Sequence, residues 1–103
     1  MTTEQEKIHI DVKVTGHVQG VSFRHGARDL AQALGLAGWI RNEPDGAVLA
    51  AIEGPQQKVE QFAKWCRRGP ATAEVRSCQW SAGTYKNIKG FTVFHNDGSI
   101  LRG

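Results

Sequence analysis

The spacing of apolar residues changes abruptly across a glycine-rich segment near the N-terminus, residues 14–26. Before it, apolar and polar residues alternate, which is typical of a strand with one covered face; the apolar set is Ile8, Ile10, Val12 and Val14. After it, apolar residues recur three and four positions apart, which is typical of an amphipathic helix; this set is Phe23, Ala27, Leu30, Ala31 and Leu34. Gly35 then suits a helix C-terminus. The chain is therefore predicted to begin with a strand, a tight loop and a helix of about three turns.

Further elements follow from turn residues and periodicity. Two apolar runs flank Glu43-Pro44-Asp45-Gly46 and predict a hairpin, because proline presets the turn and glycine accepts a positive φ. A second helix is predicted with Pro55 in its first turn and its end before Gly69. Strands are expected over residues 73–80 and 91–94, which completes the order β-α-β-β-α-β.

This order is that of the α+β, ferredoxin-like (split βαβ) fold, a two-layer sandwich with two helices on one face of an antiparallel-rich sheet. Right-handed crossovers place both helices on the same face, so His9, Asp11 and Lys13 are expected on the open one. Residues 8–95 are predicted to form the domain. Residues 1–7 are expected to be a flexible tail and residues 96–103 a C-terminal extension.

Composition narrows the range of partners. The chain has 103 residues and a net charge of +3, with its basic residues spread along the sequence. That distribution suits small anions better than nucleic acid. No apolar run approaches the ~20 residues that span a bilayer, and the N-terminus is polar. We therefore expect a cytoplasmic monomer without a nucleic-acid or membrane partner.

Neither a metal site nor a disulfide framework is indicated. The four histidines and two cysteines are scattered, with no CxxC or HxxxH spacing, so we expect no metal and no other cofactor. Cys66 and Cys78 are expected to be buried thiols, although a bridge between them stays open. The tryptophans are expected to pack in the core rather than to stack on RNA bases; they are Trp39, Trp65 and Trp80.

The glycine-rich segment is the candidate functional site. Gly16 and Gly20 lie between the first strand and the first helix, where successive backbone N–H groups and a helix N-terminus can cradle an anion. Ser22 is expected to cap the helix. Arg24 lies in the first turn, where its charge opposes the helix dipole. Its position there makes sense if the site binds an anion.

Two segments, "GHVQGVSFR" and "GWIRNEPDGAVLAAIEG", resemble the signature segments of the acylphosphatase family, small enzymes that hydrolyse carboxyl–phosphate anhydrides. The resemblance implies that Arg24 and backbone N–H groups of the loop hold the phosphoryl group; the loop residues are His17, Val18, Gln19, Gly20, Val21 and Ser22. It further implies that the Asn42 side chain positions the attacking water. The predicted function is hydrolysis of acyl phosphates to a carboxylate and inorganic phosphate, without a metal or a covalent intermediate.

The same residues also fit other roles. A non-catalytic, acylphosphatase-like module that binds phosphate or serves a larger protein is the second candidate. Retention of both Arg24 and Asn42, and a free-standing chain, favour the enzyme. His17 and His25 are expected to be surface residues, because no carboxylate at a recognisable spacing orients either ring.

Overall fold

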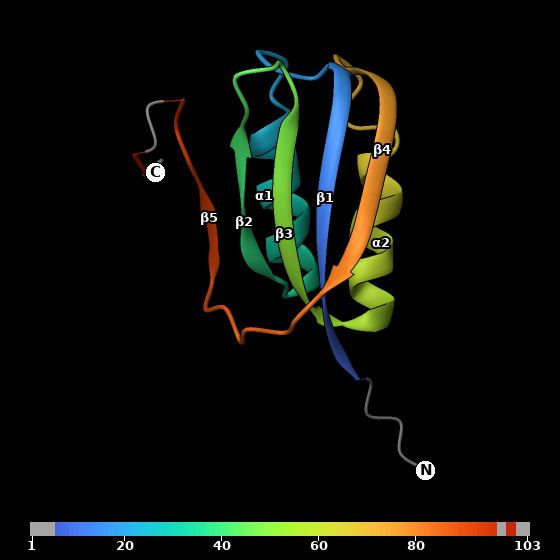
Figure 1. The fold of residues 1–103 in the computed structure, drawn as a ribbon, viewed down its shortest axis with the longest axis vertical. Helices are drawn as coiled ribbons and strands as arrows, with labels where there is room; N and C mark the ends of the chain where they lie inside the picture. The colour runs from blue at the N-terminus through green and yellow to red at the C-terminus, as the bar shows by residue number, and fades with distance from the viewer. Residues whose placement is uncertain (1–5, 97–98, 101–103) are drawn as a thin grey trace.

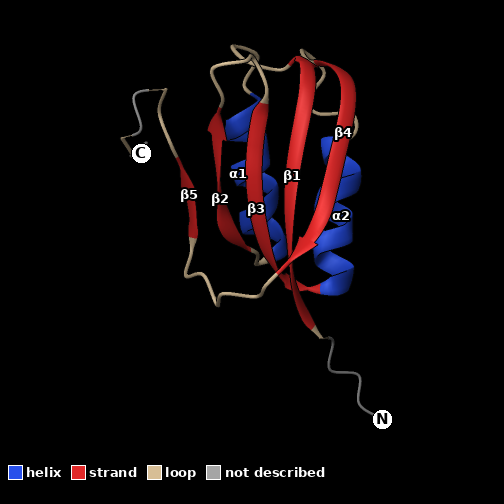
Figure 2. Cartoon of the chain, viewed as in Figure 1, coloured by secondary structure: helices blue, strands red, loops and turns tan. Residues whose placement is uncertain are grey.

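The computed structural model of the protein describes residues 6–96 and 99–100. The described residues form five strands and two helices, shown in Figures 1 and 2. In chain order these are β1 (Lys7–His17), α1 (Phe23–Leu34), β2 (Ala37–Asn42), β3 (Val48–Pro55), α2 (Gln56–Cys66), β4 (Glu74–Gly83) and β5 (Phe91–Val93). The predicted tail, residues 1–7, lies mostly outside the described residues, and β1 already begins at Lys7.

The strands form one mixed sheet in the order β4-β1-β3-β2-β5. β1 pairs antiparallel with β3 and β4, β2 pairs antiparallel with β3, and β5 lies parallel to β2. Both helices cover the same face of the sheet (Figure 1). The predicted two-layer, ferredoxin-like α+β sandwich is therefore confirmed.

The core lies between the sheet and the two helices. The apolar sets of the first strand and the first helix meet there, as the periodicity predicts. Phe23 of α1 and Phe62 of α2 are almost fully buried, and the Trp65 ring packs against Phe23 with 5.1 Å between ring centroids. Burial of this apolar surface is the main force that holds the layers together.

The second helix begins one residue later than predicted. Pro55 is the last residue of β3 and caps α2 with φ −58° and ψ 136°, which is an extended conformation. The prediction placed Pro55 inside the first turn. Pairing of Pro55 with Lys7 across β3 and β1 keeps the residue in the sheet. β4 likewise runs beyond its predicted end at Trp80 to Gly83.

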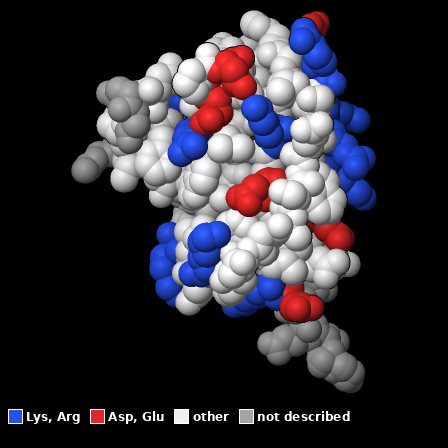
Figure 3. All heavy atoms as spheres, viewed as in Figure 1, with Lys and Arg blue, Asp and Glu red and all other residues white. Residues whose placement is uncertain are grey.

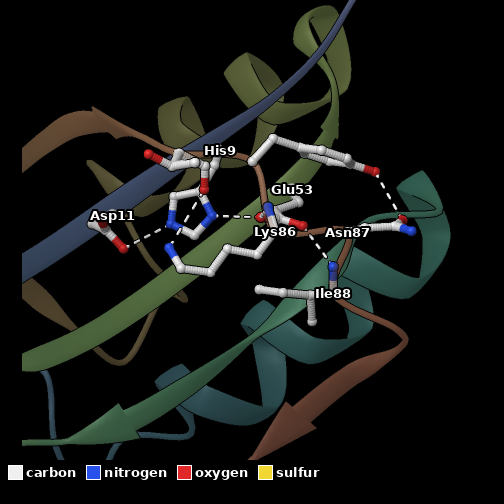
Figure 4. Close-up of polar contacts among 8 residues, drawn as sticks. His9, Asp11, Glu53, Lys86, Asn87 and Ile88 are labelled. Atoms are coloured by element: carbon white, nitrogen blue, oxygen red, sulfur yellow. Dashed lines mark hydrogen bonds and ion pairs between the residues drawn. The ribbon is translucent and has the colours of Figure 1, made fainter.

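His9 lies with Asp11 on the face of the sheet away from the helices, as predicted, but the expectation that this face is open at His9 is wrong. Asp11 and Lys13 are exposed, but His9 is only 3% exposed. The chain between β4 and β5 crosses the sheet at this end, and Glu53 of β3 accepts hydrogen bonds from the backbone N–H groups of Lys86 and Ile88 there (Figure 4). The crossing segment, residues 84–90, therefore covers His9.

Elsewhere the face of the sheet away from the helices is exposed to solvent and carries both basic and acidic side chains (Figure 3). Lys13 pairs with Asp45 at 3.1 Å, and Arg41 pairs with Glu43 at 2.6 Å.

The packing role expected for Trp80 is also wrong, since this side chain is 50% exposed. Trp80 pairs with Val12 and so faces the helix layer, but it lies on an edge strand beyond the full cover of α2.

Candidate active site

The candidate site lies at one end of the sheet, where β1 ends, α1 begins and β2 ends (the upper end in Figure 1). Gly16 makes the exit from β1 possible. The β1–β4 register shifts between Thr15 and Gly16, and Gly16 has φ +123°. A Cβ atom on Gly16 would collide with the carbonyl oxygen of Glu74 on β4. Glycine is therefore required where the strand turns into the loop.

The loop backbone turns twice through the left-handed region, at Gly20 with φ 75° and at Ser22 with φ 66°. Ser22 is the N-cap residue of α1, but its hydroxyl makes no capping hydrogen bond, so the predicted capping role of the side chain is wrong. A usual N-cap has extended backbone geometry, which the left-handed conformation of Ser22 does not provide. The N-terminal N–H groups of α1 consequently have no side-chain cap from this residue, which suits them to an anion.

Side chains of the loop anchor it to the rest of the fold. Val18 is 1% exposed and belongs to the core. Gln19 Nε2 donates to the carbonyl oxygens of Glu43 at 2.8 Å and Ala47 at 2.9 Å, which ties the loop to the β2–β3 turn. The Thr72 hydroxyl donates to the Val21 carbonyl at 2.7 Å. In these contacts the loop uses the Gln19 side chain and the Val21 carbonyl. Its backbone N–H groups can therefore point at a ligand.

A hollow of about 230 Å³ lies against the loop and the start of α1. It is lined by Val18, Gly20, Ser22, Phe23, Arg24 and His25. Arg24 is half-buried, and its Nη1 donates to the carbonyl oxygen of Phe94 at 2.6 Å. This bond holds the guanidinium at the edge of the hollow, and the group has further N–H donors for an oxyanion.

Asn42 is the last residue of β2, and its two amide ends differ in their surroundings. Nδ2 donates to Oδ1 of Asn96 at 2.8 Å. Oδ1 is buried and has no hydrogen-bond partner among the residues that the structure describes. Arg24 is thus hydrogen-bonded to Phe94, and Asn42 to Asn96. Phe94 and Asn96 lie two residues apart in one short segment after β5.

The sequence prediction missed Phe94 and Asn96 as parts of this site. It assigned Asn96 to a C-terminal extension, of which residues 97–98 and 101–103 lie outside the described residues. The parallel pairing of β5 with β2 carries the segment to the site, and the Phe94 N–H extends that pairing to the Ile40 carbonyl at 3.0 Å. No local sequence pattern indicates which later strand will pair in parallel with β2.

Two histidines and two cysteines complete the list of candidate groups. His17 belongs to the loop and His25 lines the hollow, and both are exposed, as predicted. Cys66 and Cys78 are free thiols, Cys66 buried and Cys78 half-buried. Burial raises the pKa of both thiols, which keeps them protonated at neutral pH. Within residues 6–96 and 99–100, His, Cys, Asp and Glu side chains form no group of three or more that could hold a metal.

A glycine-rich loop, an uncapped helix N-terminus and an arginine around one hollow are the donors with which proteins bind phosphate-like oxyanions. On a ferredoxin-like sandwich, they define a small oxyanion-binding domain. The acylphosphatase family model matches residues 10–95, and the chain belongs to the acylphosphatase family.

Individual relatives agree with this assignment. A curated acylphosphatase of Nocardioides sp. is 49% identical over 84 residues, which cover 82% of this chain and 85% of the relative. The solved acylphosphatase from Coxiella burnetii superposes with a TM-score of 0.81 at 32% identity, covering 84% of this chain and 92% of that one. Full-length HypF has a TM-score of 0.80 at 21% identity, covering 95% of this chain and 13% of HypF, and shows a shared fold alone.

The family and the enzyme class predicted from the sequence, an acylphosphatase hydrolase, are confirmed. The family acts on small-molecule acyl phosphates. In the part of the chain that the structure describes, neither helix has the length and apolar character needed to cross a membrane.

Proposed function

We propose that this chain hydrolyses the carboxyl–phosphate bond of acyl phosphates by direct attack of a water molecule that Asn42 orients. The observation that carries the proposal is the set of oxyanion donors around one hollow: the glycine-rich loop, the start of α1 and Arg24. Asn42 ends β2, and its bond to Asn96 joins it to the short segment whose Phe94 carbonyl holds Arg24. In this proposal a water that donates to the Asn42 amide oxygen directs a lone pair of the water oxygen at phosphorus.

Arg24 and the loop hold the phosphoryl group in this proposal. Phosphoryl transfer passes through a loose transition state with charge on the equatorial oxygens, so catalysis depends on positioned donors. The backbone N–H groups of residues 17–22 and the remaining donors of Arg24 supply them. The Phe94 carbonyl supports this role, because it holds the guanidinium at the hollow.

The bond changes balance without a covalent enzyme intermediate. The water oxygen forms a bond to phosphorus while the bond between phosphorus and the carboxyl oxygen breaks. The leaving group departs as a carboxylate, whose conjugate acid has a pKa of about 4, so it needs no general acid. A phosphoryl oxygen takes the proton of the water, and the products are a carboxylate and inorganic phosphate.

Hydrolysis of benzoyl phosphate by the wild type and by Asn42→Ala tests this proposal, with inorganic phosphate as a competitive inhibitor of both. We expect turnover by the wild type, a large loss in the variant and similar inhibition constants. Phosphate binding without hydrolysis by the wild type would instead identify the non-catalytic, phosphate-binding module. Cytoplasmic location and a monomeric state remain inferences from the sequence, and size-exclusion chromatography measures the second.

A further inference from the structure

The hollow beside the glycine-rich loop is lined by a residue to which the proposed mechanism gives no role. His25 lines it together with Arg24 and the loop, and its side chain is exposed. The imidazole ring has no hydrogen-bond or ion-pair partner among the residues that the structure describes. An imidazole has an N–H donor in either of its neutral forms. His25 therefore offers the hollow a donor that the fold itself does not use.

The first turn of α1 sets the direction in which His25 faces. Successive residues of an α-helix are about 100° apart around its axis. Phe23 is buried in the core between α1 and the sheet, and Arg24 reaches the segment after β5. His25 comes a further step round, on the side of α1 away from the sheet. Helical side chains also lean toward the helix N-terminus, so His25 leans toward the loop from this outer side.

The geometry of phosphoryl transfer determines where the acyl group must lie. The attacking and leaving oxygens are roughly in line through phosphorus. In the proposed function the water is oriented by Asn42, which ends β2 in the sheet layer and is bonded to Asn96 after β5. The leaving carboxylate consequently departs on the opposite side of the phosphoryl group, away from the sheet. That is the side from which His25 lines the hollow.

We propose that His25 contacts the acyl side of the substrate, where its imidazole N–H donates to the acyl carbonyl oxygen. This inference rests on the proposed function, because attack by water from the Asn42 side is what places the acyl group at His25. When the bond between phosphorus and the bridging oxygen breaks, its electron pair spreads over both oxygens of the leaving carboxylate. A hydrogen bond to one of them strengthens as this charge develops. The N–H proton stays on the ring throughout.

Three variants test this contact. His25→Ala removes the donor, His25→Gln keeps an N–H group of similar reach, and Gln32→Ala is the control. Gln32 is exposed on the same face of α1, about two turns from His25. We expect His25→Ala to lower kcat/KM for benzoyl phosphate about fivefold, the factor that one net hydrogen bond of about 1 kcal/mol represents. His25→Gln and Gln32→Ala should stay within about twofold of the wild type. The inhibition constant of inorganic phosphate and the melting temperature should be unchanged in all of them.

The leaving group supplies a readout that a merely structural role would not change. 4-Methoxybenzoate is a poorer leaving group than 4-nitrobenzoate, so its departure depends more on stabilisation of the developing charge. The loss of kcat/KM in His25→Ala should therefore be larger for 4-methoxybenzoyl phosphate than for 4-nitrobenzoyl phosphate. An equal loss for the two substrates would overturn the inference, as would an unchanged kcat/KM for benzoyl phosphate.

A probe that is not hydrolysed tests the contact without turnover. Phenacylphosphonate keeps the acyl carbonyl group but has a methylene group in place of the bridging oxygen. At saturation it should shift the ring ¹⁵N NMR signals of His25 more than inorganic phosphate does, and a shift no larger than that of phosphate would overturn the inference. A larger shift in a protein that does not hydrolyse benzoyl phosphate would keep the contact between His25 and the acyl group and reject the proposed function instead.

Discussion

A buried polar cluster fastens the segment that leads into the active site from the far end of the sheet (Figure 4). Glu53 Oε2 lies 2.6 Å from His9 Nδ1 and accepts the Lys86 N–H at 2.6 Å, while Oε1 accepts the Ile88 N–H at 2.7 Å. His9 Nε2 lies 3.0 Å from a carboxylate oxygen of Asp11. Glu53 is 2% exposed, so water cannot replace these partners.

Replacing Glu53 by Gln keeps the shape and removes one acceptor oxygen. Two carboxylate oxygens serve three N–H groups in the native cluster, and a single amide oxygen cannot reach all of them. The amide NH₂ group then faces at least one donor, and leaving one buried donor unpaired costs about 1–3 kcal/mol. The remaining bonds also lose the strength that the negative charge gives them. We expect Glu53→Gln to lower the free energy of unfolding by about 2–4 kcal/mol, a large share of the ~5–15 kcal/mol of a typical domain.

Urea unfolding at neutral pH measures this loss, and Glu60→Gln is the matched control. Glu60 is exposed on α2 and accepts a hydrogen bond from the Gln56 side chain at 3.0 Å. The control should lie within about 0.5 kcal/mol of the wild type. A Glu53→Gln protein as stable as this control would refute the assignment of a stabilising role to the cluster.

The pH dependence of stability gives an independent check on the same group. Burial alone would raise the pKa of Glu53, but hydrogen bonds from Ile88, Lys86 and His9 together outweigh burial and lower it below the ordinary value of 4.5. A carboxyl group with a lowered pKa stabilises the fold fully above the unfolded value, and this contribution is lost as pH falls through the folded pKa. The difference in unfolding free energy between wild type and Glu53→Gln should therefore shrink as pH falls below about 4.5.

Three further results are expected. Arg24→Lys should weaken inhibition by inorganic phosphate at least tenfold, since an ammonium cannot copy the planar fork, whereas Arg28→Lys on the same helix should not; equal inhibition of the two would contradict the assignment. Asn42→Ala should lower kcat about a hundredfold with phosphate inhibition and melting temperature unchanged, so a folded variant with normal kcat would remove the water-positioning role. Activity should survive exhaustive treatment with EDTA, and a loss restored by added Mg²⁺ or Zn²⁺ would contradict this.

The parts of the fold and site that the sequence alone determined depend on neighbours along the chain. The change of apolar spacing predicted β1, the glycine loop and α1, because strand and helix each impose their own period on a buried face. Gly16 and Arg24 were placed in the candidate site for the same reason, since a strand-to-loop-to-helix junction is a local structure. The hairpin around Glu43–Gly46 was predicted correctly because its turn depends on adjacent residues, and Gly46 has the expected positive φ of 94°.

The tertiary structure decided whatever depends on segments distant in sequence. His9 sits in an alternating pattern that predicts exposure, and it is buried because a loop some 80 residues along the chain crosses over it. Asn42 meets Asn96, 54 positions away, because β5 returns parallel to β2. Such contacts leave no periodic trace in either segment. A hydrogen bond requires two groups within about 3 Å in a set geometry, and only the folded path of the chain brings residues so far apart in sequence to that distance.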